Sequence, residues 1–199
     1  DRKEDLKRRL APLILRRTKD EVASELPPKT ILVHPVELTV EQKDLYETVR
    51  ATMDKRVRQA IAAQGLAQSR IVFLDALLKL RQICCDPRLL AMEEAHGLAS
   101  AKLDYLGELL ATLREEGRRV LLFSQFTTML QLIGRKLEEL GIAYLQLTGS
   151  SRDRGALVRK FQEGTTPLFL ISLKAGGTGL NLTAADTVIH YDPWWNPAA

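Results

Sequence analysis

The chain has 199 residues, of which 45% are hydrophobic and 27% are charged. These values are ordinary for a globular protein and exclude a disordered tail or a collagen-like fibre. Every apolar run is much shorter than the roughly 20 residues that a membrane-spanning helix needs, so we expect no membrane partner. A chain of this length can bury a core without disulfide or metal staples.

The net charge is +4, and all of the excess lies near the N-terminus. Residues 1–20 hold eight basic and four acidic side chains, whereas residues 21–199 hold 21 of each. Charge alone favours a solvated helix face in the first segment and does not indicate a nucleic-acid ligand.

Cys84 and Cys85 are the only cysteines, and they are adjacent. Neighbouring cysteines rarely bond to each other, and two of them make no zinc site. Their number favours a reducing intracellular compartment, and we assign them no role.

The first hundred residues are predicted to be mostly helical. Leucine spacing over residues 6–14 predicts a short amphipathic helix that Pro12 bends or ends. Residues 31–38 are β-branched and predict a strand, with Pro35 indicating an edge position. Thr39 and Gln42 have the spacing of a capping box.

Two helices are expected after that box. An apolar stripe at fourfold spacing over residues 45–61 predicts a long helix, and residues 71–83 predict a second one that ends at Asp86-Pro87. The polar residues 92–99 are our candidate linker.

The second half predicts strands that alternate with helices, which is typical of a parallel sheet covered on both faces. The expected helices are residues 103–113, 126–140 and 153–162, and the expected strands are residues 120–123, 143–147, 167–173 and 187–191. Ligands of such sheets bind beyond the carboxyl ends of the strands. The segments that leave the strands are rich in glycine and hydroxyl residues, which predicts a polar-ligand site at that edge: 124–127, 148–152, 172–179 and 192–197.

The glycine-rich segment 172–179 has two interpretations. Its glycines would let backbone N–H groups approach a phosphate, with Lys174 adding positive charge and Thr178 a hydroxyl. The segment is not a Walker A loop, because the pattern G-x-x-x-x-G-K-[ST] is absent from the chain. Taken alone, it favours a turn that needs glycine only for its backbone geometry.

Arginine and acidic residues near the same edge carry weaker signals. Arg152 and Arg154 open a helix, where cations oppose the helix dipole and a bound anion would relieve them. Asp186 and Asp192 are expected at opposite ends of the last strand, so they cannot act as a carboxylate pair.

Several strings in the second half resemble motifs of the SWI/SNF-type ATPases, which are double-stranded DNA translocases of helicase superfamily two. Residues 170–186 continuing to 188–192 and 195–197 resemble motif V and its extension. Residues 120–126 (VLLFSQF) resemble motif IV, and residues 147–154 resemble the segment between the two.

The first half resembles the same family, in the family's order. Residues 15–22 and 26–29 are similar to the link between its two motor lobes, and residues 80–84 and 100–103 are similar to the helical stretch that follows. The resemblance therefore covers nearly the whole chain.

The resemblance implies an α/β fold: a RecA-like parallel sheet with helices on both faces, preceded by a helical insertion subdomain. Residues 1–30 would form the inter-lobe link, residues 31–99 the helical insertion with one edge strand, and residues 100–199 the second RecA-like lobe, incomplete before motif VI.

The function implied is that of the C-terminal motor lobe of an ATP-dependent double-stranded DNA translocase or remodeller. Its partners would be duplex DNA and the first RecA-like lobe of the same polypeptide, which supplies the Walker A lysine and the acidic residues that hold Mg²⁺. Motif VI supplies arginine fingers worth several orders of magnitude in rate. Since the chain stops before that motif, we expect no catalytic residue in it and no ATP hydrolysis by it alone.

The resemblance also implies binding residues. Gly179 and Asn181 are expected to face ATP. The residues expected to contact DNA are Ser124, Gln125, Phe126, Thr127, Gly149, Ser150, Arg152, Lys174, Ala175, Gly176, Gly177, Thr178, Trp195 and Asn196. The contacts of residues 174–178 would be made largely through backbone amides and hydroxyls, which meet phosphates without reading bases.

The loop 149–154 is shorter than in many eukaryotic members, which favours a bacterial-type enzyme acting at the nucleoid; a eukaryotic member would be nuclear. Two alternatives remain. One is a superfamily-two motor lobe that acts on RNA, and the other is a non-enzymatic nucleic-acid or protein adaptor with the same fold.

Overall fold

The computed structural model describes residues 2–14, 29–177 and 179–193. The chain forms two compact units, Asp1–Pro35 and Val36–Ala199, which are described separately. In the first unit, α1 (Arg2–Leu10) ends before Pro12, as the sequence predicts. Asp5 pairs with Arg8 and Arg9 on the exposed surface of this helix at 2.8 and 3.1 Å. In the described part of the chain, no helix is long and apolar enough to cross a bilayer.

The predicted edge strand at residues 31–38 is wrong. Residues 29–39 form neither helix nor strand. Ile31, Leu32 and Val33 are 69%, 74% and 85% exposed. A β-branched run becomes a strand only when a neighbouring chain accepts its backbone hydrogen bonds, and these residues join no sheet in the described structure.

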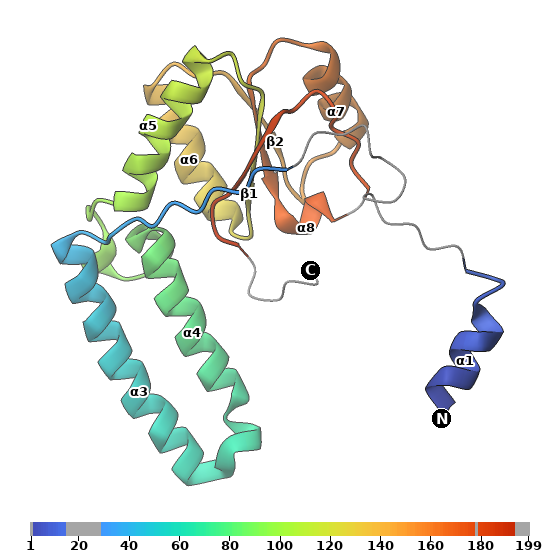
Figure 1. Cartoon of the computed structure of the whole chain (residues 1–199). Coiled ribbons are helices and arrows are strands. Elements are labelled where there is room, and N and C mark those ends of the chain that lie inside the picture. The colour runs from blue at the N-terminus through green and yellow to red at the C-terminus, as the bar shows by residue number, and fades with distance from the viewer. Residues whose placement is uncertain (1, 15–28, 178, 194–199) are drawn as a thin grey trace. The chain divides into compact units, whose positions relative to one another are not determined.

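Two long helices follow, α3 (Val40–Gln68) and α4 (Arg70–Cys85), and they lie side by side in Figure 1. The predicted capping box is confirmed: the Gln42 amide donates to Thr39 Oγ1 at 3.2 Å, and the Thr39 amide donates to Gln42 Oε1 at 3.5 Å. Gly65 interrupts α3 with a φ of 78°, a conformation that glycine adopts without strain.

Gln42 also joins α3 to two other helices. Its side chain is fully buried; Nε2 donates to the Ile83 carbonyl at 3.2 Å, and Oε1 accepts from the Ala101 amide at 3.0 Å. Ala101 begins α5 (Ala101–Glu115). The segment between α4 and α5 belongs to the same core, because Ala95 is fully buried beside Leu45 and Ile83. Residues 92–99 are therefore attached to the helices through Ala95 and the half-buried Leu98, whereas Met92, Glu93, Glu94, His96, Gly97 and Ala99 are exposed.

The sheet has four strands in the order β2-β3-β1-β4, and every neighbouring pair is parallel, as expected. Ser124 pairs with Ser172, so the last residues of β1 and β3 lie at the same level. The strands are β1 (Val120–Ser124), β2 (Tyr144–Leu147), β3 (Leu168–Ser172) and β4 (Thr187–His190).

Helices cover both faces of the sheet, which confirms the predicted α/β class (Figure 1). Leu122 and Leu170 face α5 and α6 (Thr127–Glu139) in one buried cluster. Phe169 and Ile171, the residues on either side of Leu170, face the opposite cluster with Phe161 of α7 (Arg154–Glu163). The alternation follows from the twofold side-chain period of a strand.

Replacing Gln42 with alanine should lower the free energy of unfolding by about 2–3 kcal/mol, because it leaves the buried Ile83 carbonyl and Ala101 amide without partners. Gln59→Ala, at an exposed position of the same helix, should change stability by less than about 0.5 kcal/mol. Urea denaturation of the three proteins measures both effects, and equal stabilities would contradict the proposed role of Gln42.

Candidate functional site

Because all four strands are parallel, the loops that follow them meet at one edge of the sheet. The serines that end β1 and β3 shape this edge from within. Ser124 and Ser172 are buried; Ser124 Oγ accepts from the Phe126 amide at 3.2 Å, and Ser172 Oγ accepts from the Ala175 amide at 3.3 Å. Ser124 was expected to face DNA, but its hydroxyl is used inside the loop.

The glycine-rich segment is ordered into a turn over its described residues, which its sequence taken alone favours. It begins with one helical turn, α8 (Leu173–Gly176), capped by Ser172. Ala175 is buried, and its carbonyl accepts from Arg154 Nη2 at 2.6 Å. The Gly177 amide donates to the Leu173 carbonyl at 3.2 Å. Two of the backbone amides expected to meet phosphates are therefore bonded within the turn, while the Lys174 side chain is exposed.

Gly176 is required by packing. A Cβ added there would lie 2.8 Å from Cε1 of Phe123, closer than real Cβ contacts allow. The Phe123 ring is held in place by stacking on His190, with the ring centroids 5.5 Å apart. The structure thus gives this glycine a packing role, because its φ is not in the positive range that would require glycine for its backbone conformation.

The start of α7 is stabilised without a bound anion. Asp153 caps the helix, because its Oδ1 accepts from the Ala156 amide at 2.8 Å. Arg154 reaches the Ala175 carbonyl of the neighbouring loop. Arg152 is exposed beside this cap. The helix-start arginines therefore give no indication of an anion of their own.

The loop after β2 is held by its hydroxyls. The Thr148 amide donates to Ser151 Oγ at 3.0 Å, and Thr148 Oγ1 lies 2.9 Å from Ser150 Oγ. Gly149 and Ser150 are exposed at its tip. The loop is thus a tight turn that presents small polar groups at the carboxyl edge.

The predicted DNA-contacting residues gather at this edge but differ in exposure. Gln125, Phe126 and Gly176 are partly buried. Gly179 and Asn181, expected near ATP, are exposed beyond α8. Among the residues expected to contact DNA, the ones exposed to solvent are Thr127, Gly149, Ser150, Arg152, Lys174 and Gly177. Thr178, Trp195 and Asn196 lie outside the described residues.

The sequence places Asp192 at this edge without indicating its role, and it does not indicate that Arg81 lies there. Asp192 follows β4, is 3% exposed, and accepts from the Gln125 amide through Oδ2 at 3.1 Å. Arg81 of α4 donates through Nη2 to the Asp192 and Pro193 carbonyls at 2.9 and 2.5 Å. The signal in the sequence was a charged residue among the leucines of α4. Asp186, at the other end of β4, accepts from the Arg119 amide, which confirms that the two aspartates are not a pair.

Burial raises the pKa of the Asp192 carboxyl above its ordinary value. The Ser124 hydroxyl and the Gln125 amide oppose this increase, as does the charge of Arg81. Burial likewise raises the pKa of the Cys85 thiol to about 12. This thiol is therefore neutral at physiological pH and unsuited to nucleophilic or metal-binding chemistry.

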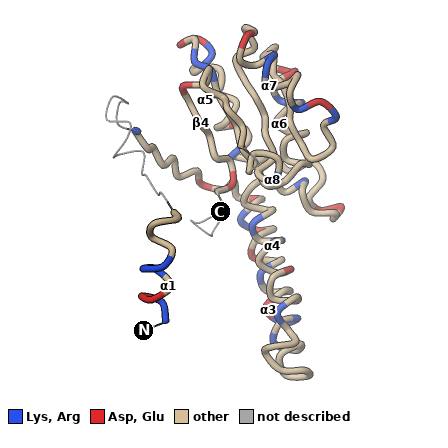
Figure 2. Tube along the Cα trace, turned by 90° about the vertical axis from the view of Figure 1, so that its right-hand side faces the viewer, with Lys and Arg blue, Asp and Glu red and all other residues tan. Residues whose placement is uncertain are grey.

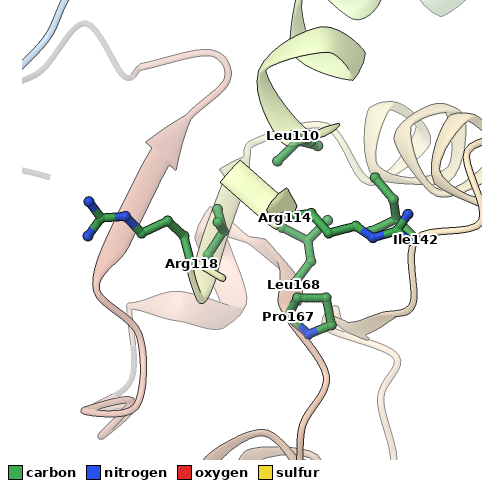
Figure 3. A pocket seen from close by; sticks show the side chains of 7 residues that line it. Leu110, Arg114, Arg118, Ile142, Pro167 and Leu168 are labelled. Carbon is green, nitrogen blue, oxygen red and sulfur yellow. The ribbon is translucent and has the colours of Figure 1, made fainter. Parts of the chain in front are cut away.

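A hollow of about 10 Å³ lies between Leu110, Arg114 and Ile142, with room for about one water molecule (Figure 3). Its other walls include Val120 and Leu168, the first residues of β1 and β3, so it lies at the opposite, amino edge.

Clusters of metal-ligating side chains are lacking where the structure is described. Residues 2–14, 29–177 and 179–193 contain no group of three or more His, Cys, Asp or Glu side chains placed to hold a metal ion. Figure 2 shows basic and acidic residues interspersed along α3 and α4.

A parallel α/β lobe with a helical insertion and a polar carboxyl edge is the architecture of a RecA-like motor lobe. Residues 101–199 match the family described as "Helicase conserved C-terminal domain", and residues 1–89 match the family described as "SNF2-related domain". The chain therefore belongs to the SWI2/SNF2 family of helicase-like proteins.

Curated relatives match over nearly all of this chain. A putative ATP-dependent helicase/translocase, YwqA of Bacillus subtilis, is 41% identical over 97% of the chain and 21% of its own length. A chromodomain-helicase-DNA-binding protein 1-like protein of Danio rerio is 40% identical over 98% of the chain and 19% of its own length. The chain thus spans about a fifth of the curated relatives that it matches. Since a bacterial and an animal protein match equally well, the bacterial type stays a prediction.

Solved structures agree. The Sulfolobus solfataricus SWI2/SNF2 ATPase C-terminal domain has a TM-score of 0.70 at 31% identity, covering 82% of this chain and 72% of that one. The core of the same ATPase in complex with double-stranded DNA has a TM-score of 0.72 at 30% identity, covering 98% of this chain and 42% of that one. The RecA-like fold class is confirmed.

Replacing Gly176 with alanine should lower the free energy of unfolding by about 1–3 kcal/mol, because the new methyl group overlaps the Phe123 ring. Gly177→Ala is the matched control, since a Cβ there would lie 3.8 Å from its nearest neighbour, the Leu173 carbonyl oxygen. Thermal or urea unfolding should separate the two variants. Equal losses would show that the Phe123 contact does not exclude a side chain.

Asp192→Asn should change the pH dependence of stability. Since burial raises the folded pKa above the unfolded value of about 3.9, the stabilisation by protonation is complete below the unfolded pKa and is lost as the pH rises through the folded pKa. The unfolding free energy of the native protein minus that of the variant should therefore rise as the pH falls from 7 to about 4. If this difference in unfolding free energy instead falls with the pH, the pKa of Asp192 is lower in the folded protein than in the unfolded protein.

Proposed function

We propose that this chain is the C-terminal motor lobe of an ATP-dependent translocase or remodeller of double-stranded DNA. The observation that supports this most strongly is the similarity to a SWI2/SNF2 core in complex with double-stranded DNA, which extends over 98% of the chain. The names of the curated relatives, a helicase/translocase and a helicase-DNA-binding protein, agree with it.

In this proposal, the carboxyl edge contacts the DNA backbone. Lys174 supplies a single exposed charge, and Thr127, Ser150 and Gly177 present hydroxyls and backbone at the same edge. Such groups bind phosphates and sugars and carry little base specificity. ATP would bind between this lobe and the first lobe, with Gly179 and Asn181 facing it from this side. Alternating closure and opening of the lobes would shift the contacts along the DNA.

Phosphate activation would depend on groups outside these residues. The chain has no Walker A pattern, and its described residues offer no cluster for Mg²⁺, so no step is assigned to the metal here. The first lobe would hold Mg²⁺.

Lys174→Ala should weaken duplex binding to a similar degree on all sequences and lower the salt slope, d log K/d log[salt], by about one in magnitude. Lys55→Ala, at an exposed position of α3, is the control and should leave the slope unchanged. Fluorescence anisotropy of residues 1–199 with two unrelated duplexes at several KCl concentrations measures both quantities. A loss confined to one sequence would contradict backbone recognition.

Purified residues 1–199 should release no phosphate from ATP above background, with or without duplex DNA. The physical reason is that the Walker lysine and the arginine fingers, which stabilise charge on the transferring phosphate, have no counterpart in the chain. Robust DNA-stimulated phosphate release by this polypeptide would overturn the assignment of roles.

The adaptor alternative differs from the motor in the motifs that the full-length gene product must contain. A motor requires a Walker A pattern upstream and an arginine-bearing helix downstream in the full-length gene product, and an adaptor requires neither. The RNA alternative predicts that duplex RNA competes with duplex DNA for the edge at equal concentration, which the same anisotropy assay measures.

A further inference from the structure

Three segments that are distant in sequence meet at the carboxyl edge through one arginine and one aspartate. Arg81 comes from α4, Gln125 directly follows β1, and Asp192 with Pro193 follows β4 after Tyr191. Arg81 Nη2 lies 3.9 Å from Asp192 Oδ2, in addition to its hydrogen bonds to the two backbone carbonyls. We call these four residues the edge junction.

The groups bound in the edge junction are mostly backbone groups. Arg81 holds the carbonyls of Asp192 and Pro193, and the Asp192 carboxylate holds the amide of Gln125. Contacts to side chains alone would leave the main chain free to move, whereas these contacts determine the path of two loops relative to α4. One loop is 124–127, which holds residues expected at DNA, and the other is described over residues 191–193.

The edge junction is costly to bury. The side chains of Arg81 and Asp192 are 16% and 1% exposed. A buried ion pair often adds less stability than an apolar pair of similar volume, so stability alone is a weak reason for one at this position. A stronger reason for an ion pair at this position is that it fixes the positions of the surrounding backbone segments.

Two polar atoms of the edge junction have no partner among the described residues, Gln125 Nε2 and Asp192 Oδ1, and both are buried. Folded proteins leave few such atoms, and local conflicts of this kind concentrate at functional sites. Both unpaired atoms belong to the two residues that meet at the Gln125–Asp192 hydrogen bond. The arrangement therefore reflects the required positions of the two loops more than the number of hydrogen bonds that can be formed.

We propose that Arg81 and Asp192 are positioning residues, which hold the loops after β1 and β4 in the arrangement that contacts DNA. The proposal rests on the proposed function for what the loops bind. It extends that function to the helical insertion, because α4 then determines the geometry of a surface whose expected contact residues all lie on other elements.

The test compares Arg81→Ala, Asp192→Ala and Asp192→Asn in the full-length gene product. Asparagine keeps an acceptor for the Gln125 amide, whereas alanine removes it. Arg88→Ala is the matched control, since Arg88 pairs with the buried carboxylate of Asp86 through Nε and Nη2 at 2.9 and 2.7 Å, and Asp86 forms no hydrogen bond to the described residues of the edge loops. ATPase rates are measured against DNA and against ATP concentration.

Arg81→Ala and Asp192→Ala should raise the DNA concentration for half-maximal stimulation roughly tenfold, as expected when supporting contacts of a site are lost. Asp192→Asn should stay within about threefold of the native protein. The KM for ATP and the DNA-free rate should be unchanged in all three. A merely structural role would instead lower the active fraction and leave the DNA constant unchanged, as expected for Arg88→Ala. That outcome in the alanine variants would overturn the proposal.

Hydrogen exchange of residues 1–199 tests the positioning without DNA. The Gln125 amide should lose protection in Arg81→Ala and Asp192→Ala and keep it in Asp192→Asn and Arg88→Ala. Unchanged protection in the alanine variants would overturn the proposal. If DNA fails to stimulate the native protein, the proposed function fails, and the exchange experiment still decides whether these residues hold the loop.

Discussion

The parallel pairing of β1 with both β3 and β4 is the constraint on which the rest of the second unit depends. It places Ser124 beside Ser172 and Phe123 beside His190, so the chain leaves neighbouring strands at one level and on one edge. The described groups expected to bind a ligand all lie at this edge, because the helices that return the chain cover the two faces of the sheet. An antiparallel β4 would have sent Asp192 to the opposite edge.

Several backbone amides of the loops at this edge donate hydrogen bonds to side chains of the same edge. Ser124, Ser172 and Asp192 bind the amides of Phe126, Ala175 and Gln125. The edge is thus already organised by internal hydrogen bonds, and less ordering entropy remains to be lost on binding. What it presents outward is sparse: one lysine, an arginine, hydroxyls and exposed glycine backbone. The second unit as a whole is also nearly neutral, since residues 36–199 hold 20 basic and 19 acidic side chains.

Several polar contacts join the helical insertion to the lobe, among them the Tyr191 hydroxyl, which donates to the Cys85 carbonyl at 2.9 Å, and two attachments made by Gln42 and Arg81. Gln42 joins α3 to α4 and to the start of α5 near the base of the hairpin. Arg81 joins α4 to the loops beyond β1 and β4. Both attachments are polar, buried and directed at backbone groups, which have fixed positions once the helices and strands form. Their directionality specifies one arrangement of hairpin and sheet, which apolar packing alone specifies less sharply.

The sequence by itself determined the elements and the edge, because side-chain periodicity, capping residues and the strand–helix alternation are local signals. The capping box at Thr39, both long helices, four parallel strands and the carboxyl-edge location all followed from it. Only the tertiary structure decided which residues face outward. The strand at 31–38 failed because pairing needs a neighbour, Ser124 and Ala175 turned inward because loop amides needed partners, and Arg81 met Asp192 across 111 positions. Such contacts depend on the folded arrangement of distant segments, which no local pattern contains.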